Sequence, residues 1–148
     1  MTAIGARVLR TRRLVRAPIW LYRAGLGILF GSRLLMLEHI GRTTGARRFA
    51  VLEVVEHPAR DEYVIVSGFG ERAQWYRNVL ADPHVRVSCG LRRSAPAIAA
   101  PLSRADADAA LRRYARVHPK AWANLRATIE RATGAPVDTL PMIHLHLT

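Results

Sequence analysis

The segment from Gly41 to Arg48 gathers two glycines, two threonines and three arginines within eight residues. Glycines permit a close approach of the backbone, hydroxyls donate hydrogen bonds, and arginines hold phosphate or carboxylate oxygens in a planar fork. The segment therefore predicts a turn that binds an anion. The structural alternative is a solvated hairpin, because Gly and Thr are ordinary turn residues. A Walker loop is excluded, since the G-x-x-x-x-G-K-[ST] spacing is absent.

A second segment, residues 67–78, reads Ser-Gly-Phe-Gly-Glu-Arg-Ala-Gln-Trp-Tyr-Arg-Asn. A strand that ends in Ser-Gly-x-Gly and leads into a helix leaves backbone N–H groups pointing outward, where an anion can bind. Trp75 and Tyr76 add aromatic faces beside it. With the basic turn, this segment predicts a site for a flat, tricyclic cofactor with a phosphorylated tail. In the structural alternative Trp75 is a core residue and Asn78 forms a local hydrogen bond.

The elements that must position these residues follow from the hydrophobic periodicity. Three strands in a meander are predicted over 34–40, 49–55 and 63–67, with turns at 41–46 and 58–61. A helix over 74–81 ends near Pro83 and precedes strands over 85–89 and 94–100. Ser103 can cap a helix that runs to 117, and a helix over 120–133 precedes a last strand over 142–147. This order predicts a small α+β barrel, mostly antiparallel, with a late helical insert.

The length of 148 residues suits one domain, and the single Cys89 excludes an internal disulfide and indicates a reducing compartment. The net charge of +12 is concentrated at the front of the chain. Residues 1–48 hold ten arginines against Glu38 alone, a balance of +9. This asymmetry predicts an anionic partner for the N-terminal third, such as lipid headgroups, a phosphorylated ligand or nucleic acid.

Residues 4–30 mix arginines with apolar side chains and the interfacial aromatics Trp20 and Tyr22, a pattern typical of helices on an anionic membrane surface. The apolar run over 19–30 is interrupted by Arg23 and is shorter than the ~20 residues that a spanning helix needs. The alternative is an N-terminal helix that packs on its own barrel or on a second subunit. We therefore divide the chain into a basic amphipathic helical segment, 1–33, and a coenzyme-binding barrel domain, 34–148.

Three motifs occur in order: G-R-T-T-G-x-R-R, then V-S-G-x-G-x-x-x-x-W-Y-R-N, then A-D-P-x-V-x-V. Their joint pattern resembles the deazaflavin-dependent nitroreductase and quinone reductase family, actinobacterial enzymes that use coenzyme F420 (an 8-hydroxy-5-deazaflavin). The resemblance extends from about Arg12 to Leu147. It implies a split β-barrel like those of flavin reductases and pyridoxamine-phosphate (PNP) oxidases, with the coenzyme in a groove at the barrel surface.

The resemblance also implies three groups of cofactor-binding residues. The phosphate and polyglutamate tail would be held by Arg42, Thr43, Gly45, Arg47 and Arg48. The deazaflavin ring and its linker would lie beside Ser67, Gly68, Phe69 and Gly70. The helix that shapes the pocket would contribute Trp75 and Asn78.

The implied reaction is hydride transfer from the reduced deazaflavin to a quinone, nitro or enone acceptor. Thr43 stands where nitro-reducing relatives often have a lysine, and the late tyrosines of those relatives are missing. Tyr114 and His118 are the candidates for a proton donor to the acceptor oxygen. The alternative for both is packing of the late helix on the barrel.

Other classes of function also fit parts of the sequence. No metal site is expected, because His144 and His146 lack a third ligand at a recognisable spacing. The rivals are a non-enzymatic basic module for membrane lipid or nucleic acid, and a split barrel that loads FMN or a lipid-like ligand. We expect a quinone-like small molecule as the acceptor and no nucleic-acid partner. We also expect a homodimer, and a cytoplasmic location at the inner face of the cell membrane.

Overall fold

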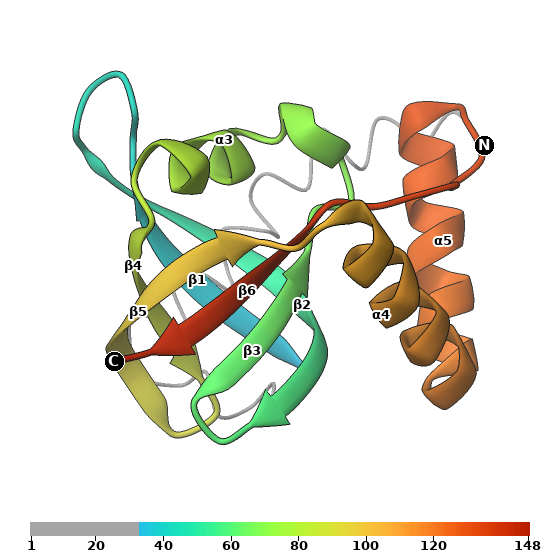
Figure 1. The fold of residues 1–148 in the computed structure, drawn as a ribbon. Helices are drawn as coiled ribbons and strands as arrows, with labels where there is room; N and C mark the ends of the chain where they lie inside the picture. The colour runs from blue at the N-terminus through green and yellow to red at the C-terminus, as the bar shows by residue number, and fades with distance from the viewer. Residues whose placement is uncertain (1–32) are drawn as a thin grey trace.

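The computed structural model describes residues 33–148, so the predicted helices and membrane contacts of residues 4–30 lie outside the described part. The described residues form six strands, three α-helices and one 3-10 turn (Figure 1). In chain order they are β1 (Leu34–Ile40), β2 (Arg47–Ala59), β3 (Glu62–Val66), η2 (Gly70–Arg72), α3 (Gln74–Ala81), β4 (His84–Cys89), β5 (Arg92–Pro101), α4 (Arg104–Val117), α5 (Pro119–Thr133) and β6 (Met142–Leu147). None of these helices has an apolar stretch long enough to cross a membrane.

The strands close into a barrel in the order β1-β2-β3-β6-β5-β4, and all neighbours are antiparallel. Alternate residues of each strand point inward, and several of these inward side chains are fully buried. They include Leu35, Leu37, Ile65, Val87 and Leu145. The α+β, mostly antiparallel barrel predicted from the periodicity is confirmed.

A second apolar cluster lies outside the barrel, where α4 and α5 cover β3 and β6 (Figure 1). Val64, Val66 and Met142 from the strands pack there against Leu111 and Ile129 from the helices. The predicted cap forms as expected, because the Asp106 backbone N–H donates to the Ser103 hydroxyl at 3.1 Å. The helical insert therefore shields one side of the barrel and leaves α3 beside one of its ends.

Two local predictions need correction. The turn predicted over 58–61 is shorter, because β2 continues through Pro58 to Ala59. Its register with β3 is irregular between Val54 and Ala59, and proline is tolerated where a strand is bulged. The Ser-Gly-x-Gly segment over 67–70 was expected to lead directly into the helix over 74–81. The 3-10 turn η2 comes first, before α3 begins.

Candidate functional site

The turn between β1 and β2 lies beside α3 (Figure 1) and depends on its two glycines. The Gly45 N–H donates to the Gly41 carbonyl at 2.8 Å, and the Gly41 N–H donates to the Ala46 carbonyl at 2.8 Å. Gly45 has a φ of +71°, which other residues rarely adopt. A Cβ on Gly41 would lie 3.0 Å from Arg48 Nε and 3.1 Å from Thr44 Oγ1. Gly45 is thus required by its backbone conformation, and a side chain on Gly41 would press against the Arg48 and Thr44 side chains.

Arg42 is fastened to α3 by four hydrogen bonds, the longest of which joins its Nη1 to the Gln74 backbone carbonyl at 3.5 Å. Its backbone N–H and its Nη1 donate to Asn78 Oδ1 at 3.1 and 2.7 Å, and its Nη2 donates to Gln74 Oε1 at 2.9 Å. All of these acceptor oxygens belong to neutral amides. The guanidinium is therefore held in place while its positive charge stays available to a ligand.

A hollow of about 200 Å³ lies between the turn and α3. Its lining consists of one glycine, two hydroxyls, two amides and two arginines: Gly41, Arg42, Thr43, Thr44, Arg48, Gln74 and Asn78. This lining carries two positive charges and no carboxylate, which suits a phosphate or a carboxylate. The volume is below the ~300–1,000 Å³ of pockets that enclose drug-sized ligands, so it can accept the tail of a cofactor rather than a tricyclic ring.

His39 lies behind this hollow and was not predicted to take part. It is 3% exposed, and Asn78 Nδ2 lies 3.1 Å from His39 Nδ1. Burial, with a smaller contribution from the charge of Arg48, lowers the pKa of His39 to about 4. The imidazole is therefore neutral near pH 7. Only the tertiary contact with α3 distinguishes His39 from an ordinary strand residue, so the sequence carried no signal for it.

The lowered pKa of His39 predicts a pH dependence of stability. An unfolded chain takes up the proton near pH 6.5, whereas the folded protein resists it down to about pH 4, so stability falls as the pH drops through this window. Between pH 6 and pH 5 the contribution of His39 amounts to about 1 kcal/mol. Urea unfolding at both pH values should show this additional loss in the wild type relative to His39→Leu. Equal losses in the two proteins would contradict the prediction.

Arg47 points to a different part of the surface from Arg42 and Arg48. Its Nε donates to Glu38 Oε1 at 2.7 Å, and its Nη2 contacts the same oxygen. Arg86 of β4 approaches the other oxygen, with Nε 3.8 Å from Glu38 Oε2. The Glu38 side chain is only 8% exposed, so it needs these positive partners.

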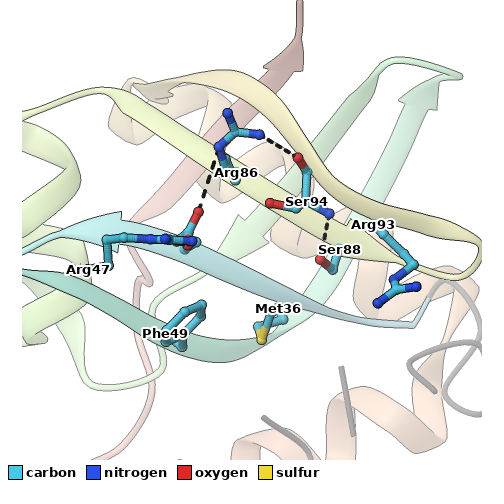
Figure 2. Close-up of a pocket in the computed structure, with 8 residues that line it drawn as sticks. Met36, Arg47, Phe49, Arg86, Ser88, Arg93 and Ser94 are labelled. Carbon is cyan, nitrogen blue, oxygen red and sulfur yellow. Dashed lines mark hydrogen bonds and ion pairs between the residues drawn. The ribbon is translucent and has the colours of Figure 1, made fainter. Parts of the chain in front are cut away.

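Figure 2 shows the pocket around this ion pair on the outer face of the barrel. It has a volume of about 480 Å³, and Arg93 lies at the other end from Arg47. Its full lining is Met36, Glu38, Arg47, Phe49, Arg86, Ser88, Arg93 and Ser94. The arginines of the predicted anion turn are thus divided between two pockets, because neighbouring residues of a strand point to opposite faces.

The loop after β3 is tied down by its serine. The hydroxyl of Ser67, a fully buried residue, donates to the Gly70 carbonyl at 2.6 Å, and its N–H donates to the Pro141 carbonyl at 2.9 Å. Gly70 has a φ of +74°. Phe69 is 61% exposed at the tip. Ser67 therefore shapes the loop, and Phe69 is the side chain that the loop presents outward.

The loop lies close to α5 and is followed in the chain by α3. A Cβ on Gly68 would lie 3.4 Å from Ile129 of α5, so the loop runs close to that helix. Trp75 on α3 packs partly against the barrel interior, with its ring 5.8 Å from that of Tyr76 in an edge-on arrangement. Gln74, which the sequence did not single out, lines the hollow in the place expected of Trp75.

Tyr114, on α4, and His118, at the C-terminal end of that helix, do not line the hollow. Tyr114 is 3% exposed, and its hydroxyl donates to Glu53 Oε1 at 2.5 Å. Burial and the Glu53 carboxylate raise the pKa of this phenol. The His118 ring centroid is 5.4 Å from that of Tyr114. Glu53 lies five residues along β2 from Arg48, which lines the hollow, a span of ~17 Å, so these two candidates are not part of the hollow.

The histidines of β6 pair locally. His144 Nε2 is 2.8 Å from Glu62 Oε1, and its ring centroid is 6.2 Å from that of His146. Within residues 33–148 no group of three or more His, Cys, Asp or Glu side chains has the arrangement of a metal site.

The family model for F420H(2)-dependent quinone reductase matches residues 14–140. The chain belongs to this family. The resemblance stated from the three sequence motifs is therefore confirmed, and membership assigns the chain to the F420-dependent oxidoreductases. The hollow beside α3 fits the anionic tail of coenzyme F420, because its lining holds two arginines and no carboxylate that would compete with a ligand for them.

Similar solved structures show the same fold. A domain-swapped dimer has 18% identity and a TM-score of 0.58, with 99% of this chain and 100% of that chain covered. An F420-H2 dependent reductase, FDR-A, has 20% identity and a TM-score of 0.53, with 77% and 94% covered. A pyridoxamine 5'-phosphate oxidase-related, FMN binding protein from Nostoc punctiforme has 12% identity and a TM-score of 0.51, with 93% and 80% covered. No curated protein sequence matches the chain. The fold of this family member is therefore the predicted split β-barrel.

Proposed function

We propose that this family member is an F420H2-dependent reductase of a quinone-like acceptor, with the coenzyme tail in the hollow between the β1–β2 turn and α3. The observation that carries the proposal is the hollow itself, where Arg42 is oriented by neutral amides and no carboxylate competes for it. When bound, the reduced deazaflavin supplies a hydride to an electron-poor acceptor. The protein supplies binding, orientation and exclusion of water.

Arg42 and Arg48 neutralise the tail in this proposal, while Thr43 and Gly45 let its oxygens approach the turn. Arg47 was expected to share this task from the family resemblance. Its contacts with Glu38 support a different role, in which it neutralises a buried carboxylate on the outer face. We therefore expect its contribution to tail binding to be small.

The ring of the coenzyme is expected beside the loop over 67–70. Ser67 and Gly70 fix this loop from within, and Gly68 passes close to α5. Phe69 then offers an exposed aromatic face against which a flat ring or a quinone can stack. Trp75 stabilises the position of α3, which carries Asn78.

A proton must reach the reduced acceptor oxygen, and Tyr114 and His118 are the sequence candidates for its donor. Tyr114 already donates its proton to Glu53, and His118 precedes α5 at the end opposite to Ile129, ~16 Å along the helix from the loop that carries Phe69. We therefore expect neither side chain to reach an acceptor beside Phe69, so His118→Gln should keep kcat within a few-fold of wild type and leave F420 affinity unchanged. Steady-state kinetics with a quinone would show this, and a loss of about 100-fold or more would make His118 the general acid.

The N-terminal segment provides access to lipophilic acceptors in this proposal. Its arginines and interfacial aromatics suit the anionic inner face of the cell membrane, with the barrel in the cytoplasm. A homodimer is a further part of the proposal, supported by a structural neighbour that is a domain-swapped dimer. Deletion of residues 1–16 should reduce sedimentation with anionic liposomes and leave F420 affinity intact.

The proposed function is tested by equilibrium binding of oxidised F420 to the purified full chain, measured by fluorescence, with FMN in parallel. We expect micromolar or tighter binding of F420 that weakens as salt rises, because the tail is anionic. Tighter binding of FMN than of F420 would favour a flavin-loading barrel. Binding of neither cofactor would overturn the proposal.

A further inference from the structure

We propose that His39 is a positioning residue for the coenzyme tail: its Nδ1 orients the Asn78 amide, and Asn78 in turn orients Arg42. The inference rests on the proposed function, because it names how the tail site is held in its binding geometry. It adds a buried residue of the barrel to a site that the motifs place entirely on the turn and the helix.

The orientation of the Asn78 amide follows from hydrogen-bond chemistry. Arg42 directs only donors at Asn78, namely its backbone N–H and its Nη1, so the amide must turn its oxygen toward Arg42. The amide nitrogen then faces His39 and donates to Nδ1 at 3.1 Å. His39 accepts this bond only if Nδ1 is unprotonated, which places the ring proton on Nε2.

The consequence for Arg42 is a guanidinium that is already in place before a ligand arrives. Arginine is a long, flexible side chain, and Arg42 is exposed. Its Nη1 donates to Asn78 Oδ1 and to the Gln74 carbonyl, and its Nη2 donates to Gln74 Oε1, so the guanidinium is restricted to the wall of the hollow. The Arg42 backbone N–H donates to the same Asn78 oxygen. If the amide turned over, its NH2 group would face two donors and these bonds to Asn78 would be lost. Affinity for an anion then falls because the guanidinium must be ordered on binding.

The surroundings of His39 support the neutral form that this role needs. It is buried at the end of β1, and α3 covers it through Asn78. The charged groups around it are Arg48 from β2 and, beyond Asn78, Arg42 from the turn. Glu38 precedes it on the same strand and so points to the opposite face. Both nearby charges are positive, and they disfavour a second proton on the ring.

The experiment compares wild type with His39→Leu, which removes the acceptor, and His39→Asn, whose amide oxygen can take the place of Nδ1. Each protein is titrated with F420 and with the same deazaflavin lacking its phosphate and glutamate tail. His39→Leu should raise the Kd for F420 about 10-fold, the equivalent of one lost hydrogen bond, and should leave the Kd for the tail-less compound unchanged. His39→Asn should recover most of the F420 affinity.

The outcomes separate this inference from the proposed function. Wild type that binds F420 together with a His39→Leu variant of equal affinity would overturn the role of His39 and keep the function. An equal loss for both ligands would reduce His39 to a general structural role and overturn the inference as well. Wild type that fails to bind F420 would overturn both. A ligand-free check is ¹⁵N NMR of the His39 ring at pH 7, where the Nε2–H tautomer is expected and the Nδ1–H tautomer would refute the assignment.

Discussion

Replacing both Arg42 and Arg48 with alanine is expected to weaken F420 binding by at least about 100-fold, since each hydrogen bond to a charged group contributes roughly 1.5–3 kcal/mol. The two guanidiniums are the cations that line the hollow beside α3, and no carboxylate in the lining offsets them. The double variant should also lose most of the salt dependence of binding, because the screened attraction to the tail is gone. Fluorescence titration at several salt concentrations measures both effects.

The matched control is the double variant Arg112→Ala and Arg131→Ala. It removes the same net charge from exposed positions on α4 and α5 that do not line the hollow. We expect its F420 affinity to stay within about threefold of wild type, because separated surface charges are largely screened. A control as weak as the test variant would mean that the overall field of this basic chain binds the tail, and the hollow would lose its special role.

Much of the barrel could be predicted from the alternation of apolar and polar residues along the sequence. The predicted strands over 34–40 and 142–147 and the helix over 74–81 have the bounds that the structure gives them. Their side chains follow the periods of 2 and 3.6 residues that place apolar groups on one face. The exceptions occur where pairing with a neighbouring strand extends an element, as in β2, which continues past Pro58 at a point where its register with β3 is bulged and tolerates proline.

The site was predictable to the extent that its groups share a turn. Arg42 and Arg48 were identified because charge and glycine spacing indicate an anion site, and both line the hollow. Arg47 belongs to the same sequence segment, yet the alternation of side chains along β2 directs it to Glu38. Gln74 and His39 could not be found in this way, since their roles arise from the docking of α3 on the barrel end, 32 to 39 residues distant in sequence from their partners.

Tyr114→Ala is expected to cost about 3–5 kcal/mol of unfolding free energy, in the range of other losses of a large buried aromatic ring. The ring is 3% exposed and belongs to the apolar cluster between α4, α5 and the barrel. Tyr114→Phe keeps the ring and should cost only about 1–3 kcal/mol, because it leaves the Glu53 oxygen without its donor. Urea unfolding of the three proteins measures both values.

The value of kcat decides whether Tyr114 only packs α4 against the barrel or also donates a proton to the acceptor. The raised pKa makes the phenol a poor acid, and its proton is already shared with Glu53, so we expect Tyr114→Phe to keep kcat within a few-fold of wild type. A general acid would instead show a loss of about 10²- to 10⁴-fold. Glu53→Gln serves as the matched variant, because it changes the partner and leaves the phenol in place. If Tyr114→Phe lowered kcat by that much while Glu53→Gln did not, Tyr114 would be the proton donor, and Glu53 only the group that holds it.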